Sequence, residues 1–177
     1  MDRGQVTDQP PSDSEARPAA GSRSELIRWM SIQDANSAGF IHGGVVMRMC
    51  DEAAGIAAIR HSGRRVVTAG MDRMTFAEPI YVGELLRCQA CVNAAWRTSM
   101  EVGVRVEAEN AVTGEVRHTS TAYLTMVAVN EHGTPQTVPP LEAIDEDEQR
   151  RQREAETRRR NRLAEREEIL LHRAAKD

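Results

Sequence analysis

One short stretch of the sequence gathers groups that an enzyme could use to activate water and to hold a negative charge. Asp51 supplies a carboxylate that can act as a general base or as a nucleophile. Gly43 and Gly44 open an apolar helical pattern, and the start of a helix presents free backbone N–H groups that can stabilise an oxyanion. The stretch therefore predicts a site in which a carboxylate and helix-end amides act on one substrate.

The same residues have structural interpretations. Asp51 follows Arg48 by three positions and could be a surface carboxylate in an ion pair, so position alone leaves the two interpretations even. Gly43 and Gly44 could serve a tight turn and close helix packing. His42, just before them, is expected to cap or pack more than to act as a base.

No metal site is predicted. The five histidines show no ligand-like spacing, and Cys88 and Cys91 form a Cys-x-x-Cys pair within an alternating strand pattern, which sends the two thiols to opposite faces. Together with Cys50 they are expected to be reduced, structural thiols.

These residues need elements to position them. Val45 to His61 carries a broad apolar arc at helical spacing, and a polar loop from Asp34 to His42 precedes it. Strand patterns with alternating apolar side chains occupy the other segments: 24–33, 65–76, 86–94, 100–109 and 116–129. The order β-α-β-β-β-β with short later connections predicts a mainly antiparallel, five-stranded curved sheet around one long helix, which is the α+β hotdog fold.

Composition divides the chain of 177 residues into three regions. Residues 1–22 are predicted to be disordered, because they contain few apolar side chains. Residues 23–140 form the predicted domain. Residues 141–177 are rich in Glu and Arg and predict a helical extension, either solvated or packed against a neighbouring subunit through Leu163 and Leu170.

The middle region resembles the hotdog acyl-CoA thioesterases, in particular the brain-type cytosolic acyl-CoA hydrolase group and its bacterial relatives. The resemblance covers about residues 24 to 130 in the right order. It rests on the stretches Asp34–Gly44, Met49–Gly55, Val67–Asp72, Phe76–Pro79, Val82-Gly83, Thr98–Val102 and Ala122–Val129.

The resemblance implies hydrolysis of fatty acyl-CoA to free acid and CoA, with Asp51 as base or nucleophile. It also implies that Asn36 from the partner subunit acts at the same site, with the Gly43 and Gly44 amides as oxyanion hole. Asn36 could instead be a loop-capping residue. The minimum assembly is then a homodimer, and the family commonly forms a trimer of dimers.

CoA binding is expected to involve further residues of the same region. Thr68 could line the site, although it could equally be an ordinary strand threonine. Arg97, Ser99 and Arg64 are candidates to contact the CoA phosphates, and solvated arginines are an equal alternative. No cofactor is expected, since coenzyme A is part of the substrate.

Composition limits the other functions. A net charge of −4 argues against general attraction to nucleic acid or membranes, and no apolar run is long enough for a bilayer span. The absence of a secretory signal pattern predicts a cytoplasmic location. The alternative functions are a hotdog hydratase or dehydratase acting on an acyl thioester, and a non-catalytic acyl-CoA binding module. The pair Asn36 and Asp51 distinguishes the thioesterase from both.

Overall fold

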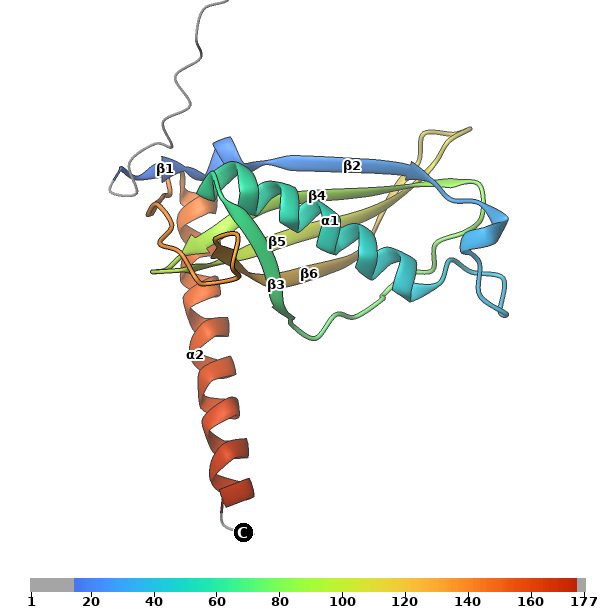
Figure 1. Ribbon diagram of the computed structural model, residues 1–177. Helices are drawn as coiled ribbons and strands as arrows, with labels where there is room; N and C mark the ends of the chain where they lie inside the picture. The colour runs from blue at the N-terminus through green and yellow to red at the C-terminus, as the bar shows by residue number, and fades with distance from the viewer. Residues whose placement is uncertain (1–14, 175–177) are drawn as a thin grey trace, which may run out of the picture.

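In the computed structural model, which describes residues 15–174, a five-stranded antiparallel sheet wraps around one long helix (Figure 1). The helix, α1, spans Gly43–Ser62. The strands lie in the order β2-β4-β5-β6-β3, with the bounds Ser24–Trp29, Glu84–Ala95, Ser99–Asn110, Val116–Val129 and Arg65–Met71. The predicted α+β hotdog architecture is confirmed.

The core lies between α1 and the concave face of the sheet. Alternate residues of β4 and β5 point inward, so that apolar side chains such as Leu86 and Val104 are fully buried while Arg87 and Arg105 lie on the outer face. The buried side of α1 is lined by small side chains, which let the helix approach the sheet closely: Ala53, Ala54, Ala57 and Ala58.

The three thiols are free, and the two in β4 occupy opposite faces as predicted. Cys88 is buried in the core beside Cys50. A hydrogen bond with Cys50, together with burial, raises the pKa of Cys88 well above its ordinary value. Cys91 is half-buried on the outer face, where its thiol donates to the carbonyl of Ala19 at 3.4 Å. Cys88 is therefore a protonated thiol, and the buried pair packs as small apolar groups.

Two predicted strands are shorter than expected. The first ends at Trp29, because Ser31 and Asp34 form a capping box around a short 3-10 helix, η2 (Ile32–Asp34). The strand after α1 ends at Met71, and a bulge between Thr68 and Gly70 already interrupts its pairing with β6. After each of these two strands, the chain continues into a loop that lies near the start of α1.

The predicted disorder of residues 1–22 is wrong for its last part, while residues 1–14 lie outside the described range. Arg17–Pro18 form β1, which pairs in parallel with β7 (Leu141–Glu142), and Ala19–Ser22 form the 3-10 helix η1. Ser22 is buried, and its hydroxyl accepts the Val92 N–H at 2.9 Å. Composition cannot reveal this pairing, because the partner segment lies more than a hundred residues away.

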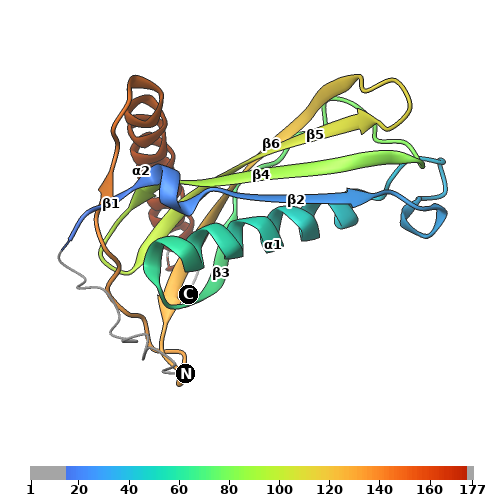
Figure 2. The same cartoon turned by 90° about the horizontal axis from the view of Figure 1, so that it is seen from above.

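The predicted C-terminal helix is present as α2, spanning Glu146–Ala174. Its first half packs on the outer face of the sheet, opposite α1 (Figure 2). Its second half extends beyond the domain (Figure 1). Neither helix of the described part of the chain combines the length and hydropathy of a membrane span.

Candidate active site

Asp51 lies in the third turn of α1, on the side that faces β3, and is half-buried. The hydroxyl of Thr68, in β3, donates a hydrogen bond to Asp51 Oδ1. Thr68 Oγ1 also lies 3.5 Å from the sulfur of Met126 in the neighbouring strand β6. The structure therefore brings two predicted site residues together, and it orients the carboxylate by a neutral donor.

The predicted structural alternative for Asp51, an ion pair with Arg48, does not form. Arg48 Nε instead donates to Glu52 Oε1 at 2.9 Å, along the solvent-exposed side of α1. Asp51 is left without a cationic partner among the described residues. Its carboxylate therefore remains available for a reactant.

The start of α1 is capped by a side chain that sequence reasoning assigned correctly. His42 is the N-cap residue, and its Nδ1 accepts the backbone N–H of Gly44 at 2.9 Å. The N–H of Gly43 has no acceptor among the described residues. Of the two predicted oxyanion amides, Gly43 is therefore the open one, and Gly44 is engaged by the cap.

Phe76, in the loop after β3, lies over the first turn of α1. A methyl group added to Gly43 would lie 3.3 Å from Phe76 Cζ, so glycine at this position permits the close approach of the ring. Phe76 remains 45% exposed. The ring therefore lines the surface beside the open amide.

Asn36 organises the loop that precedes α1. Its side-chain oxygen accepts the backbone N–H groups of Ala38 at 2.9 Å and Phe40 at 3.2 Å. The predicted loop-capping role of Asn36 is thus present in the protomer. Its side-chain amide nitrogen has no partner in the described part of the chain, so the carboxamide keeps a donor for another molecule.

Asp34 fixes the base of this loop. It is buried, it receives the Ser31 N–H at 2.9 Å, and it forms an ion pair with Arg28 at 2.5 Å. The backbone N–H of Ser31 is the main cause that holds the pKa of Asp34 below its ordinary value, and the Ser31 hydroxyl and Arg28 add to this effect against the opposing effect of burial. The Asp34 carbonyl then accepts the His42 N–H at 2.8 Å, which ties the loop to the helix start.

Asp51 and the open amide lie at different points along α1. Gly43 opens the helix and Asp51 follows eight positions later, which is about 12 Å along the axis at roughly 1.5 Å per residue. Asn36 lies near the Gly43 end of α1, because the contact between Asp34 and His42 ties its loop to the helix start. No hydrogen bond joins Asn36 to Asp51 within the described protomer.

The predicted CoA-binding residues other than Thr68 gather near the opposite end of α1. Arg97 is exposed in the turn between β4 and β5, and Ser99 begins β5. Arg64 follows α1, and its Nε donates to the Thr137 carbonyl at 3.1 Å. The backbone of Val138 donates to the Arg97 carbonyl at 3.1 Å, so one connecting segment touches both turns.

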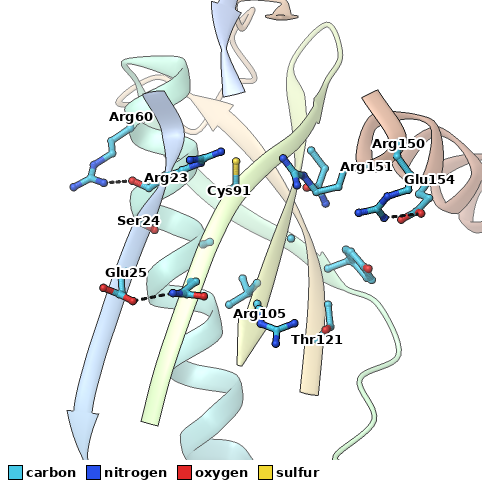
Figure 3. Close-up of a pocket in the computed structure, with 16 residues that line it drawn as sticks. Arg23, Ser24, Glu25, Arg60, Cys91, Arg105, Thr121, Arg150, Arg151 and Glu154 are labelled. Atoms are coloured by element: carbon cyan, nitrogen blue, oxygen red, sulfur yellow. Dashed lines mark hydrogen bonds and ion pairs between the residues drawn. The ribbon is translucent and has the colours of Figure 1, made fainter. Parts of the chain in front are cut away.

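A cavity of about 780 Å³ lies on the outer face of the sheet, beside the start of α2 (Figure 3). It is rich in charge, with five arginines and two glutamates: Arg23, Arg60, Arg105, Arg150, Arg151, Glu25 and Glu154. None of the predicted site residues lines it. It is therefore separate from the surface around Asp51, which lies on the α1 side.

Sequence reasoning did not single out Asp34 or Phe76. The spacing of Ser31 and Asp34, which matches a capping box, was the available signal for Asp34. Phe76 belongs to the Phe76–Pro79 stretch that carried part of the family resemblance, but no local pattern places its ring over Gly43. Such a contact depends on how the loop after β3 folds back.

The sequence matches a known family, and it resembles named proteins. Residues 38–115 match the model of the thioesterase superfamily. Over 152 residues the chain is 34% identical to the mouse cytosolic acyl coenzyme A thioester hydrolase, an alignment that covers 85% of this chain and 40% of that protein. The chain therefore spans about 40% of the length of this relative and of its rat counterpart.

Two solved structures align along nearly their whole length. An apo-hexameric acyl-CoA thioesterase shares 39% identity and a TM-score of 0.82, covering 85% of this chain and 97% of its own. An acyl-CoA hydrolase from Staphylococcus aureus, in complex with butyryl coenzyme A, coenzyme A and coenzyme A disulfide, shares 32% identity and a TM-score of 0.81, covering 88% and 95%. That hydrolase has also been solved with alanine in place of an asparagine, an aspartate and a threonine.

Proposed function

Because this chain belongs to the thioesterase superfamily, we propose that it is an acyl-CoA thioesterase that hydrolyses fatty acyl-CoA to the free acid and CoA. The names of the mouse and Staphylococcus aureus relatives support the reaction and the substrate class. The word cytosolic in the mouse name supports a cytoplasmic location, which in turn fits a role in fatty acid metabolism.

The observation that carries this proposal is the Asp51 carboxylate, which is held by the Thr68 hydroxyl and pairs with no cation in residues 15–174. A carboxylate in this setting can act as a general base that takes a proton from water as the water attacks the thioester carbon. It could also attack that carbon itself and form an acyl anhydride, which water then opens. In both routes the carbonyl oxygen becomes negative and the CoA thiolate leaves.

The Staphylococcus aureus hydrolase adds support for the three polar residues. The asparagine, aspartate and threonine replaced in its variants have the same spacing along their chain as Asn36, Asp51 and Thr68 have here. Equal spacing across both gaps is unexpected for three unrelated positions. We therefore assign these three residues to one active site.

The separation along α1 argues that two protomers build each site. A thioester oxygen held by the Gly43 N–H cannot lie within reach of Asp51 of the same chain, because about 12 Å of helix separates them. We assign Asn36 and Gly43 to one protomer and Asp51 and Thr68 to its partner. The free amide nitrogen of Asn36 would then orient the water or the carbonyl.

Apolar side chains around Asp51 support a partner at this surface. Met47, one turn earlier on α1, is 40% exposed, and Val67, next to Thr68, is 49% exposed. A second protomer packed here would cover both and would remove water from the carboxylate. The hexameric relative supports a dimer as the minimum unit and a trimer of dimers as the full assembly.

Arg97 and Arg64, both predicted to contact the CoA phosphates, differ in how their side chains are placed to bind an anion. Arg97 and Ser99 remain the candidates for the phosphates, because Arg97 is exposed in a turn and can reach a bound anion. The Arg64 side chain already binds the Thr137 carbonyl, so its part in CoA binding would require that contact to be shared or given up. His42 serves the helix cap, which disfavours the hydratase alternative that would need a histidine base.

The test compares two neighbouring carboxylates by thiol release from a panel of acyl-CoA chain lengths. Asp51→Asn is expected to lower kcat by at least about a hundredfold, the usual size of a general base contribution. Glu52→Gln is the matched control, since Glu52 is exposed and its one ion pair within the described residues is with Arg48. Equal turnover by the two variants, with unchanged circular dichroism, would remove Asp51 from the mechanism.

A further inference from the structure

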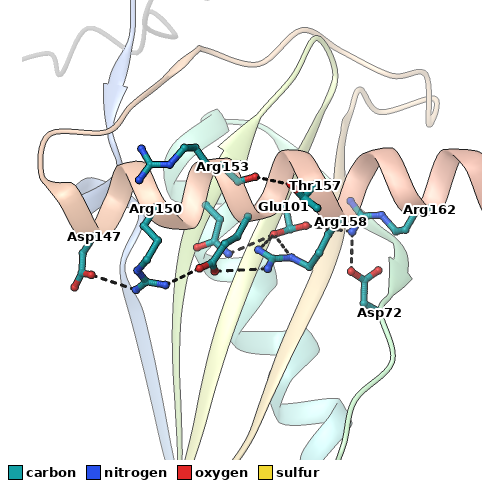
Figure 4. A network of polar contacts seen from close by, with 10 residues as sticks. Asp72, Glu101, Asp147, Arg150, Arg153, Thr157, Arg158 and Arg162 are labelled. Atoms are coloured by element: carbon teal, nitrogen blue, oxygen red, sulfur yellow. Dashed lines mark hydrogen bonds and ion pairs between the residues drawn. The ribbon is translucent and has the colours of Figure 1, made fainter.

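Helix α2 crosses the outer face of the sheet and leaves it at the β3 edge. Arg158 binds Glu101 of β5 at 2.7 Å and lies 3.6 Å from the ring centroid of Tyr123 in β6. One turn later, Arg162 binds Asp72, just after β3, at 2.7 Å (Figure 4). The helix is therefore directed across β5 and β6 toward the edge of the protomer that carries Thr68.

The direction of α2 is fixed by a buried charge. Glu101 is fully buried, and both of its oxygens bind arginines of α2, with Arg162 at 3.1 Å from Oε2. An uncompensated buried carboxylate is strongly unfavourable, so Arg158 and Arg162 cannot move away together. Ala155 is also buried against the sheet, which fixes the helix one turn earlier. The first half of α2 is thus a rigid base for the second.

Within the described part of the protomer, the second half contacts another element through an exposed ion pair, between Glu165 and Arg73 at 3.2 Å. Every described residue from 163 to 174 is exposed, a length of about 18 Å at roughly 1.5 Å per residue. This part nevertheless carries four large aliphatic side chains that are 44% to 65% exposed: Leu163, Ile169, Leu170 and Leu171. A helix of this length gains little stability alone, so contact of its Ile169 and Leu170 side with another surface would stabilise it.

A groove of about 720 Å³ runs between this segment and the β3 edge. Its apolar lining includes Met71, Ile169 and Leu170. Ile169 lies seven residues after Arg162, so it faces the same side of the helix as the arginines that contact the sheet. The side of α2 that packs on the protomer's own sheet therefore continues beyond the β3 edge, where the described part of the protomer has no further strand.

We propose that residues 163–174 of α2 form a clasp that packs on a second copy of this chain, added along the β3 edge. The inference rests on the proposed function, in which a partner must approach Asp51 and Thr68 from this side. β3 is an edge strand, paired only with β6 in the described protomer. A twofold-related copy at that edge continues the sheet beneath the overhanging helix and covers the open strand.

The charges of the groove and of the overhanging segment also favour a second copy of this chain. The groove is lined by five arginines, among them Arg73, Arg166 and Arg173, and by only two acidic residues. Glu167 and Glu168, also on the overhanging segment, lie outside the groove and form no ion pair among the described residues. In a twofold dimer the α2 segments cross in opposite directions, so the acidic side of one helix meets the basic groove of the other.

Sedimentation velocity of the full chain without substrate tests the clasp. Ile169→Asp places a charge in the covered face, and it is expected to raise the dimer dissociation constant at least about tenfold, equivalent to roughly 1.4 kcal/mol. Leu171→Asp is the matched control, because Leu171 is more exposed and does not line the groove. It is expected to sediment like the parent protein. Both side chains are exposed in the protomer, so neither variant is expected to change the far-ultraviolet circular dichroism.

Two results overturn the clasp. One is an Ile169→Asp protein with the same dissociation constant as the parent. The other is a parent protein that sediments as a monomer at every concentration, which would leave this face to a different partner. Assembly is measured by sedimentation, and catalysis is measured by thiol release. If Ile169→Asp dissociates while Asp51→Asn remains active, the proposed function is rejected and the clasp is retained.

Discussion

At the scale of single residues, the neighbours of Asp51 determine what its carboxylate can do. A cation such as Arg48 would neutralise it, but Arg48 is held by Glu52. The Thr68 hydroxyl supplies a directional contact to Oδ1 instead. Because a hydroxyl orients the carboxylate without removing its charge, the second oxygen stays free to accept a proton.

In the proposed mechanism Thr68 is a positioning residue, and its hydroxyl can be removed with little change in the shape of the side chain. Thr68→Val is expected to lower kcat about tenfold, corresponding to roughly 1.4 kcal/mol, with little change in KM. Thr68→Ser keeps the hydroxyl and is expected to retain most of the activity. Thiol release at saturating substrate separates the two variants. If valine and serine give the same kcat, the hydrogen bond to Asp51 has no part in the reaction.

At the scale of elements, α1 was the most predictable part of the fold. Gly43 and Gly44 mark its start and Gly63 its end, where φ of +66° favours a residue without a side chain. Alternation predicted β4, β5 and β6 because one face of each strand is dry. These signals are local, and they were sufficient for the hotdog architecture.

Elements that depend on distant contacts were not predictable. The strand β1 exists because Arg17 donates its N–H to the Pro140 carbonyl at 2.9 Å, a contact between the two ends of the domain. The seating of α2 depends on Glu101, a residue that reads as the polar side of an ordinary strand. No periodicity within α2 indicates which surface its arginines meet.

The last turn of α1 contains a histidine with a consequence for stability. His61 is buried, and its Nε2 lies 3.0 Å from the Pro139 carbonyl. Burial is the main cause that lowers the pKa of His61 below its ordinary value of 6.5, and Arg17 adds to the effect. Between the lowered pKa and 6.5 the unfolded chain binds more protons, so stability falls as the pH decreases through this window.

The measurement is urea unfolding at pH 7.5 and pH 5.5. The parent protein is expected to lose stability on acidification by up to about 1.4 kcal/mol per pH unit within the window. His61→Gln, which can still donate to Pro139, is expected to lose less. An equal decrease in both proteins would show that other groups cause the pH dependence.

At the scale of the whole molecule, the proposed mechanism needs two chains to complete each site. The open amide of Gly43 and the carboxylate of Asp51 lie at different turns of α1, so in this proposal a second copy supplies one of them. Residue types and spacing identified Asp51 and the glycines as chemical groups, but the partner's contribution came only from the family resemblance. A single sequence carries no local record of which side chains meet across an interface.

The most direct test of this account mixes Asn36→Ala and Asp51→Ala protomers. Each variant alone is expected to be inactive. Half of the randomly mixed dimers are heterodimers, each with one complete site, so the mixture is expected to recover about one quarter of the parent activity. The measurement is thiol release from acyl-CoA by the mixture and by heterodimers purified through two different affinity tags, which are expected to show about half of the parent activity per dimer. Verified heterodimers with no more activity than either variant alone would contradict the shared site.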